Sequence, residues 1–241
     1  MGDQDAAIAE YHAALGLNPT NDAAHVALGE ALGEKGDWDG EMREDRDALR
    51  VNPNNGSAYV GVGYALAHKG DWDGATAQFH EALRLEPNNA KAHINLGLAL
   101  GQRGDWDGEA AEEREALRLS PNDDSAHVAL GGALGQRGDW DGAVAEEREA
   151  LRLNPNNELG HVFLGLALGV KGDWVGDISE QRTALRINPN SALAHYSLGL
   201  ALEQKGDLSG ALQELRAAYE LDSKDPNYKQ AYERVVQKEE K

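Results

Sequence analysis

Six prolines divide the sequence into equal lengths. They follow one another at intervals of 34 residues, as Pro19, Pro53, Pro87, Pro121, Pro155 and Pro189. Tryptophan keeps the same interval, at Trp38, Trp72, Trp106, Trp140 and Trp174. A fixed period of this length is typical of architectures in which each unit buries its apolar face only by stacking on the next. The chain is therefore expected to build its core from repeated units rather than around one centre.

The period predicts six full repeats with partial units at both ends. The full repeats are 22–55, 56–89, 90–123, 124–157, 158–191 and 192–225. Residues 1–21 are interpreted as the second helix of a partial repeat. Residues 226–241 are predicted to form a C-terminal capping helix, because their apolar residues lie in one stripe among charged ones.

Each repeat has the pattern of two helices joined by a tight turn. In 124–157, His127, Leu130 and Leu134 have the spacing of one helical face. The segment Arg137-Gly138-Asp139 ends that helix with a glycine and supplies an aspartate to cap the next one. Pro155 then stands where the second helix must have ended. The repeats are thus predicted to be helical hairpins.

The pattern of 124–157 resembles the tetratricopeptide repeat family, and the resemblance covers essentially the whole chain. The residues that carry it are His127, Leu130, Gly131, Leu134, Ala143, Ala150 and Pro155. It is similar to the tandem arrays found in bacteria. The resemblance implies an all-α, right-handed α-solenoid, or superhelix, of 34-residue helix–turn–helix repeats. It also implies a non-catalytic scaffold for protein–protein interaction.

The sequence departs from the family in the middle of the second helix. A large apolar residue is expected there, but the six repeats have Asp45, Phe79, Glu113, Glu147, Gln181 and Leu215. Repeats with an acid or amide there carry His25, His93, His127 and His161 in the first helix, whereas the repeat with Phe79 carries Tyr59. The last repeat, with His195 and Leu215, breaks this rule. We predict that histidine and acid meet within each hairpin; the alternative is a rotated helix whose carboxylates reach solvent.

The charge balance narrows the class of partner. There are 42 acidic and 23 basic residues, a formal net charge of −19. This field repels phosphate backbones and anionic lipid surfaces, so neither nucleic acid nor membrane insertion is expected. The expected partner is another protein or peptide with apolar and basic character. We expect a soluble protein. The sequence does not determine its compartment, although we expect the cytoplasm.

No constellation of catalytic residues stands apart from the repeat pattern, so we predict neither an enzyme nor a cofactor. The repeated histidines lie one hairpin apart, about 10 Å, which is too far to share a metal ion. The Gly-Asp-Trp-Asp-Gly turns lack the closing glutamate of a calcium loop and are interpreted as helix caps. No metal site is predicted.

A second stripe on the first helices is the candidate binding surface. It lies about 140° around the helix from the histidine, leucine and glycine face. In proteins that this chain resembles, that side lines a concave groove for a peptide or a helix. The predicted groove residues are Val26, Glu30, Val60, Tyr64, His68, Ile94, Leu98, Val128, Val162, Leu166, Tyr196 and Leu200. The family's clamp for a terminal carboxylate is not carried over, because its lysine and asparagine are missing here.

Two other roles stay open. The N-terminal half repeat lacks its hairpin mate, so Ile8, Tyr11 and Leu15 form a candidate surface for self-association into a dimer or oligomer. Alternatively, the chain is the accessory segment of a larger enzyme.

Overall fold

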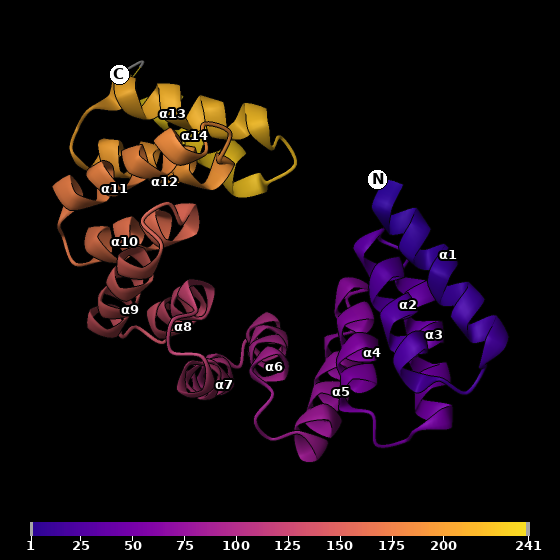
Figure 1. Ribbon diagram of the computed structural model, residues 1–241. Helices are drawn as coiled ribbons and strands as arrows, with labels where there is room; N and C mark the ends of the chain where they lie inside the picture. Colours follow the sequence, from indigo (N-terminus) through magenta and orange to yellow (C-terminus); the bar gives the residue numbers. More distant parts are fainter. Residues whose placement is uncertain (1, 240–241) are drawn as a thin grey trace. The chain divides into compact units, whose positions relative to one another are not determined.

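The computed structural model describes residues 2–239, which form fourteen α-helices and no strand (Figure 1). The helices fall into two units, one ending at Pro121 and one beginning at Asn122. Unit 1 contains α1 (Gly2–Leu17), α2 (Asp22–Glu34), α3 (Trp38–Val51), α4 (Gly56–His68), α5 (Trp72–Leu85), α6 (Ala90–Gln102) and α7 (Trp106–Leu119). Unit 2 contains α8 (Asp124–Gln136), α9 (Trp140–Leu153), α10 (Glu158–Val170), α11 (Trp174–Ile187), α12 (Ala192–Gln204), α13 (Leu208–Leu221) and α14 (Pro226–Glu239). The predicted all-α repeat solenoid is confirmed.

Helix ends follow from the chemistry of the turns. In the turn between α4 and α5, Gly70 adopts φ = 80°, a conformation that suits glycine, and it lets the chain reverse. The carboxylate of Asp71 then accepts a hydrogen bond from the Gly74 amide at 2.9 Å and caps α5. In the turn before α4, Asn55 accepts from the Ala58 amide at 3.0 Å. Equivalent caps recur along the chain, so each repeat re-establishes the same hairpin.

The two helices of a hairpin approach closely because glycine and alanine stand at their contact. A Cβ placed on Gly63 of α4 would lie 2.6 Å from Cε1 of Phe79 in α5. Phe79 is buried in a cluster that also holds Val60 and Leu96, so this hairpin shares its core with α6 of the following one. Leu215 fills the same place in α13, within a cluster completed by Val235 of α14.

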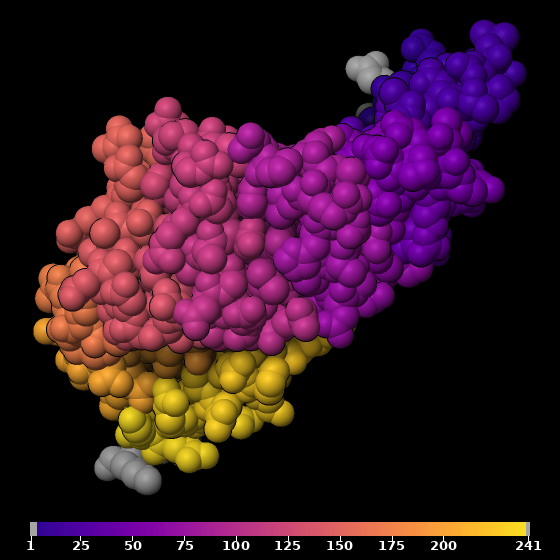
Figure 2. Space-filling model, turned by 90° about the horizontal axis from the view of Figure 1, so that it is seen from below, coloured from indigo at the N-terminus to yellow at the C-terminus, as the bar shows by residue number. Residues whose placement is uncertain are grey.

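Within each unit, successive first helices of the hairpins are neighbours. In unit 1, α4 contacts both α2 and α6; in unit 2, α10 contacts both α8 and α12. Consecutive hairpins of unit 1 cover one face of that unit as adjacent bands (Figure 2). The exposed sides of α2, α4 and α6 are called the first-helix face of unit 1 below.

Candidate functional site

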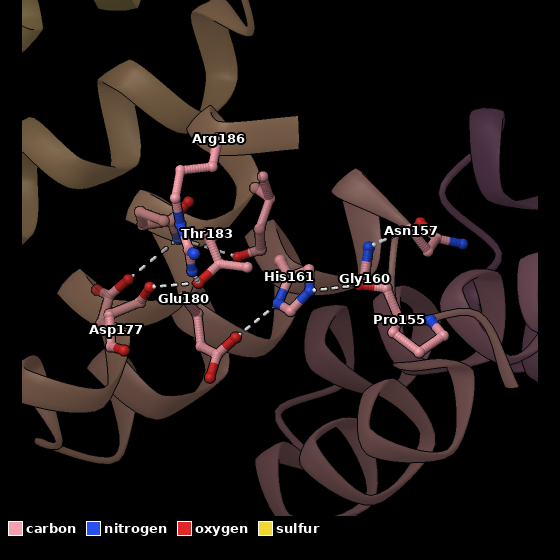
Figure 3. A network of polar contacts seen from close by, with 11 residues as sticks. Pro155, Asn157, Gly160, His161, Asp177, Glu180, Thr183 and Arg186 are labelled. Carbon is pink, nitrogen blue, oxygen red and sulfur yellow. Dashed lines mark hydrogen bonds and ion pairs between the residues drawn. The ribbon is translucent and has the colours of Figure 1, made fainter. Parts of the chain in front are cut away.

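The repeated histidines bridge two elements of the chain. The Nδ1 of His161 lies 2.6 Å from Oε2 of Glu180 in α11, and its Nε2 lies 3.1 Å from the carbonyl oxygen of Pro155 in the preceding turn (Figure 3). The same two contacts recur at His25, His93 and His195. Both partners offer acceptor oxygens, one to each ring nitrogen. The ladder of histidines therefore fastens each turn to the hairpin that follows.

The histidines were predicted to pair with Asp45, Glu113, Glu147 and Gln181, and this prediction is wrong. Each histidine instead contacts the residue that comes one place before the predicted partner. His25 lies 2.8 Å from Glu44, and His127 lies 2.7 Å from Glu146. Successive helical residues point about 100° apart. The first acid faces the histidine at the edge of the hairpin, and the second turns inward.

The inward carboxyls are buried against glycines of the first helix. Asp45 is 1% exposed and packs against Gly29, while Glu147 is fully buried and its Oε1 would lie 2.5 Å from a Cβ on Gly131. Both carboxyl oxygens of Asp45 and of Glu147 lack a hydrogen-bond partner. Burial raises the pKa of Asp45 to about 8, with Glu41 adding to the rise, and the pKa of Glu147 to about 9.

A second group of buried carboxyls lies one helical turn earlier. Glu41, Glu109 and Asp177 are buried near Gly33, Gly101 and Gly169. Burial raises the pKa of Glu41 and of Glu109 to about 7, and that of Asp177 to about 6, where a hydrogen bond from Gln181 opposes the rise. Sequence reasoning missed this group; the signal was an acid at the place where Ala75, Ala143 and Ala211 stand in the other repeats.

A cavity of about 720 Å³ opens on the first-helix face of unit 1. Four predicted groove residues line it: Val26, Glu30, Val60 and Tyr64. The buried acids Glu41 and Asp45 and the glycines Gly33 and Gly61 also line it, together with Trp38 of α3 and Lys91 of α6. The cavity thus combines an apolar and aromatic wall with two buried carboxyls.

The aromatic wall is a packed cluster. The ring of Trp38 stacks on that of His68, with centroids 3.9 Å apart and planes within 3°. Tyr64 meets both rings edge-on, at centroid distances of 5.8 Å from Trp38 and 4.5 Å from His68. The stacked and edge-on contacts of these three rings are typical of aromatic groups held in a fixed orientation. His68, another predicted groove residue, thereby supports the wall.

The remaining predicted groove residues differ in exposure. On α6, Leu98 is 47% exposed and Ile94 is half-buried. In unit 2, Val128 and Val162 are buried, and Leu166 packs against a cluster formed by α10, α11 and α12. Tyr196 and Leu200 pack on the core of the last hairpin and α14, and the Tyr196 ring lies 4.9 Å from that of Tyr228. The large exposed apolar side chains of the predicted groove are therefore Tyr64 and Leu98, both in unit 1.

The predicted self-association residues lie on α1, which packs on α2. Ile8, Tyr11 and Leu15 are half-buried there, and Leu17 at the end of the helix is 90% exposed. Self-association stays a prediction.

One trio of side chains in the described part of the chain has ligand atoms within 4.8 Å of one another, His25, Glu44 and Asp47. The Asp47 carboxylate pairs with Arg50, and His25 with Glu44 is one copy of the repeated bridge. These two contacts account for the trio without a metal ion. Among residues 2–239, no helix combines the length and the apolar character needed to cross a membrane.

Two family models match the chain in complementary segments. The model described as "TPR repeat" matches residues 1–36 and 63–104, and the model described as "Tetratricopeptide repeat" matches 114–158 and 180–226. Among proteins with curated functions, none matches by sequence.

Solved structures share the fold. The chain is similar to a structure of the APC/C hetero-tetramer Cut9–Hcn1, with a TM-score of 0.85 and 18% identity, over 98% of this chain but 46% of that one. It spans less than half the length of that relative. YrrB, described as a TPR protein with an unusual peptide-binding site, is similar with a TM-score of 0.63 and 20% identity, over 76% of this chain and 95% of that one. MamA is similar with a TM-score of 0.59 and 26% identity, over 68% of this chain and 95% of that one.

Proposed function

The chain belongs to the tetratricopeptide repeat family, whose members are generally scaffolds for protein interaction, and we propose that it binds a segment of another protein on the first-helix face of unit 1. The observation that carries the proposal is the pair of large apolar side chains left open on that face. Tyr64 is 38% exposed and Leu98 is 47% exposed, at equivalent places on the neighbouring helices α4 and α6. Exposed apolar residues gathered beside a cavity mark a binding surface.

The occupant is an extended or helical segment with apolar anchors. The fifth residues of the first helices, such as Val60, are buried between neighbouring helices and hold the scaffold together. The ninth residues, Tyr64 and Leu98, are one repeat apart and offer contacts for two side chains of a bound segment. The net charge of −19 favours a partner with basic residues around these anchors.

The test begins with peptides selected on the full-length protein from a displayed library of short random sequences. A selected peptide, labelled with a fluorophore, is then titrated by anisotropy. Replacing both Tyr64→Lys and Leu98→Lys is expected to weaken binding by about tenfold or more, since two apolar anchors are lost. Helical circular dichroism should change little, because Leu98 is about half exposed and Tyr64 lies at the partly exposed edge of the aromatic cluster rather than in the buried core.

The matched control is Val175→Lys, which adds the same charge at a residue of α11 that is 67% exposed. It should leave peptide affinity unchanged. Selected peptides that bind the double variant as tightly as the natural sequence would show that the face has another role.

A further inference from the structure

The cavity of unit 1 contains acceptor oxygens without donors. Oε2 of Glu41 and both carboxyl oxygens of Asp45 have no hydrogen-bond partner, although Glu41 is only 4% exposed. Buried polar atoms almost always have a partner, because leaving one unpaired destabilises the folded state. These two side chains line the cavity. These oxygens have almost no exposed surface and lie within the wall of the cavity, so a bound group with donors would satisfy them once the two side chains turn toward it.

Two glycines make this arrangement possible. A Cβ on Gly61 would overlap Oδ2 of Asp45, and a Cβ on Gly33 would overlap Oε2 of Glu41. Both glycines line the cavity themselves. In unit 2, Phe163 stands at the place that Gly61 has in unit 1, and Glu147 at the place of Asp45. Glu147 is also buried without a hydrogen-bond partner, which makes it a matched control.

We propose that this cavity binds the guanidinium group of an arginine side chain, which belongs to the protein segment held on the first-helix face of unit 1. The inference rests on the proposed function and names the chemistry of the partner at one point of contact.

Arginine fits the cavity better than lysine does. A guanidinium has five N–H donors in a planar fork and pairs with two carboxylates at once, whereas an ammonium has three donors on one atom. A guanidinium also keeps its charge when it leaves water. Its flat face stacks on aromatic rings, and Trp38 and Tyr64 provide such rings in the wall. Glu30, exposed at the rim, adds attraction at the entrance.

Lys91 is the cation already at the rim. Its Nζ lies 3.5 Å from Oε1 of Glu30, and both side chains are largely exposed. Its charge lowers the pKa of Glu41, against the larger effect of burial. A bound guanidinium must compete with this charge. Replacing Lys91→Met is therefore expected to strengthen binding of an arginine peptide by a few-fold.

Binding of a cation is linked to ionisation of the two acids. Burial raises the pKa of Glu41 to about 7 and of Asp45 to about 8, so a fraction of each is protonated near neutral pH. A guanidinium favours the ionised form, so its binding releases protons, and affinity should rise as pH increases from about 6 to about 9. The other charged groups around them are Glu30, Glu34 and Lys35 of α2, Glu44 of α3 and Lys91 of α6.

The probe is the blocked tripeptide acetyl-Leu-Arg-Leu-amide, titrated into the full chain and followed by the indole N–H resonance of Trp38. Its neutral isostere contains citrulline in place of arginine, and a third peptide contains lysine. The arginine peptide is expected to bind at least about tenfold more tightly than the citrulline peptide, with the lysine peptide between them. The double variant Glu41→Gln and Asp45→Asn keeps the volumes and should remove the preference for arginine.

The control variant is Glu147→Gln, which alters a buried acid outside this cavity and should leave all three affinities unchanged. Equal binding of the arginine and citrulline peptides, or no effect of the double variant, would overturn the assignment. Equal binding of the lysine peptide would overturn the choice of guanidinium. These outcomes can be told apart from a failure of the proposed function: library peptides that still need Leu98, which does not line the cavity, would leave the proposed function standing.

Discussion

Buried acids are the residues that distinguish this chain from an array with a purely apolar core. Asp45 and Glu147 stand where Phe79 and Leu215 fill the same hairpin position, and all four side chains are buried. In folded proteins, a carboxyl without a donor stays buried mainly by remaining protonated. The raised pKa values of Asp45 and Glu147 express that cost.

The variant Glu147→Leu is expected to stabilise the protein. Leucine already occupies this place as Leu215, packed against Gly199 as Glu147 is against Gly131. The change removes an unpaired buried carboxyl, and the gain in the free energy of unfolding should be about 1–3 kcal/mol at neutral pH. Urea unfolding measures it.

The gain should grow with pH. The pKa of Glu147 rises from 4.5 to about 9 on folding. Between these values the folded state holds a proton that the unfolded state has released, so raising the pH favours unfolding. The contribution of this carboxyl is thus most favourable below its unfolded pKa and is lost as pH rises through the folded one. The control is Glu149→Gln on the same helix, where Arg152 lowers the pKa of the acid. Its difference in unfolding free energy from the natural chain should not grow from about pH 5 to pH 9. A leucine variant less stable than the natural chain throughout this range would contradict the burial argument.

At the scale of the helix, α1 differs from the other second helices because no hairpin mate precedes it in the described residues. It packs on α2, and its end carries Leu17, which is 90% exposed. Exposed apolar side chains on a partly covered helix favour association between copies.

Removing residues 1–21 is expected to shift any self-associated form of the protein towards monomer, as measured by sedimentation velocity. The point variant Leu17→Lys should act in the same direction. Its control is Leu221→Lys, since Leu221 occupies the same place at the end of α13 and is 44% exposed. A natural chain that sediments as a monomer at high concentration would remove the case for association through α1.

At the scale of the whole molecule, contacts within each unit join only helices that are adjacent or next to adjacent in the described chain. Stability in such arrays is close to a sum over neighbouring repeats, so the ends open first. The C-terminal end has an added fastening: Glu203 of α12 accepts hydrogen bonds from Arg234 and Lys238 of α14, both at 2.7 Å.

Hydrogen exchange should therefore rank the helices by position. Amides of α1 are expected to exchange fastest, those of α14 more slowly, and those of α4 and α10 slowest, as followed by mass spectrometry of peptic fragments. Replacing Glu203→Gln should speed amide exchange in α14, so that its rate approaches that of α1. Identical protection in all these helices would indicate that the molecule opens only as a whole.

The sequence alone determined the repeat architecture, because its signals are local. A glycine such as Gly70, an aspartate cap such as Asp71 and a proline such as Pro87 act on their own turn, and the period repeats them. The stripe that carries Tyr64 and Leu98 could also be predicted from the sequence, since helical geometry determines which residues share a face.

The tertiary structure alone decided which side chains meet. Whether His25 faces Glu44 or Asp45 depends on a difference of about 100° around α3, and that rotation is set by packing against α2 and α4 rather than by any local signal. Glu41 is buried against Gly33 and Asp45 against Gly61, and these two glycines of the cavity wall come from two different hairpins. Such a site forms only where several helices pack around a shared cavity, and the cavity arises from the packing of the repeats rather than from any one of them.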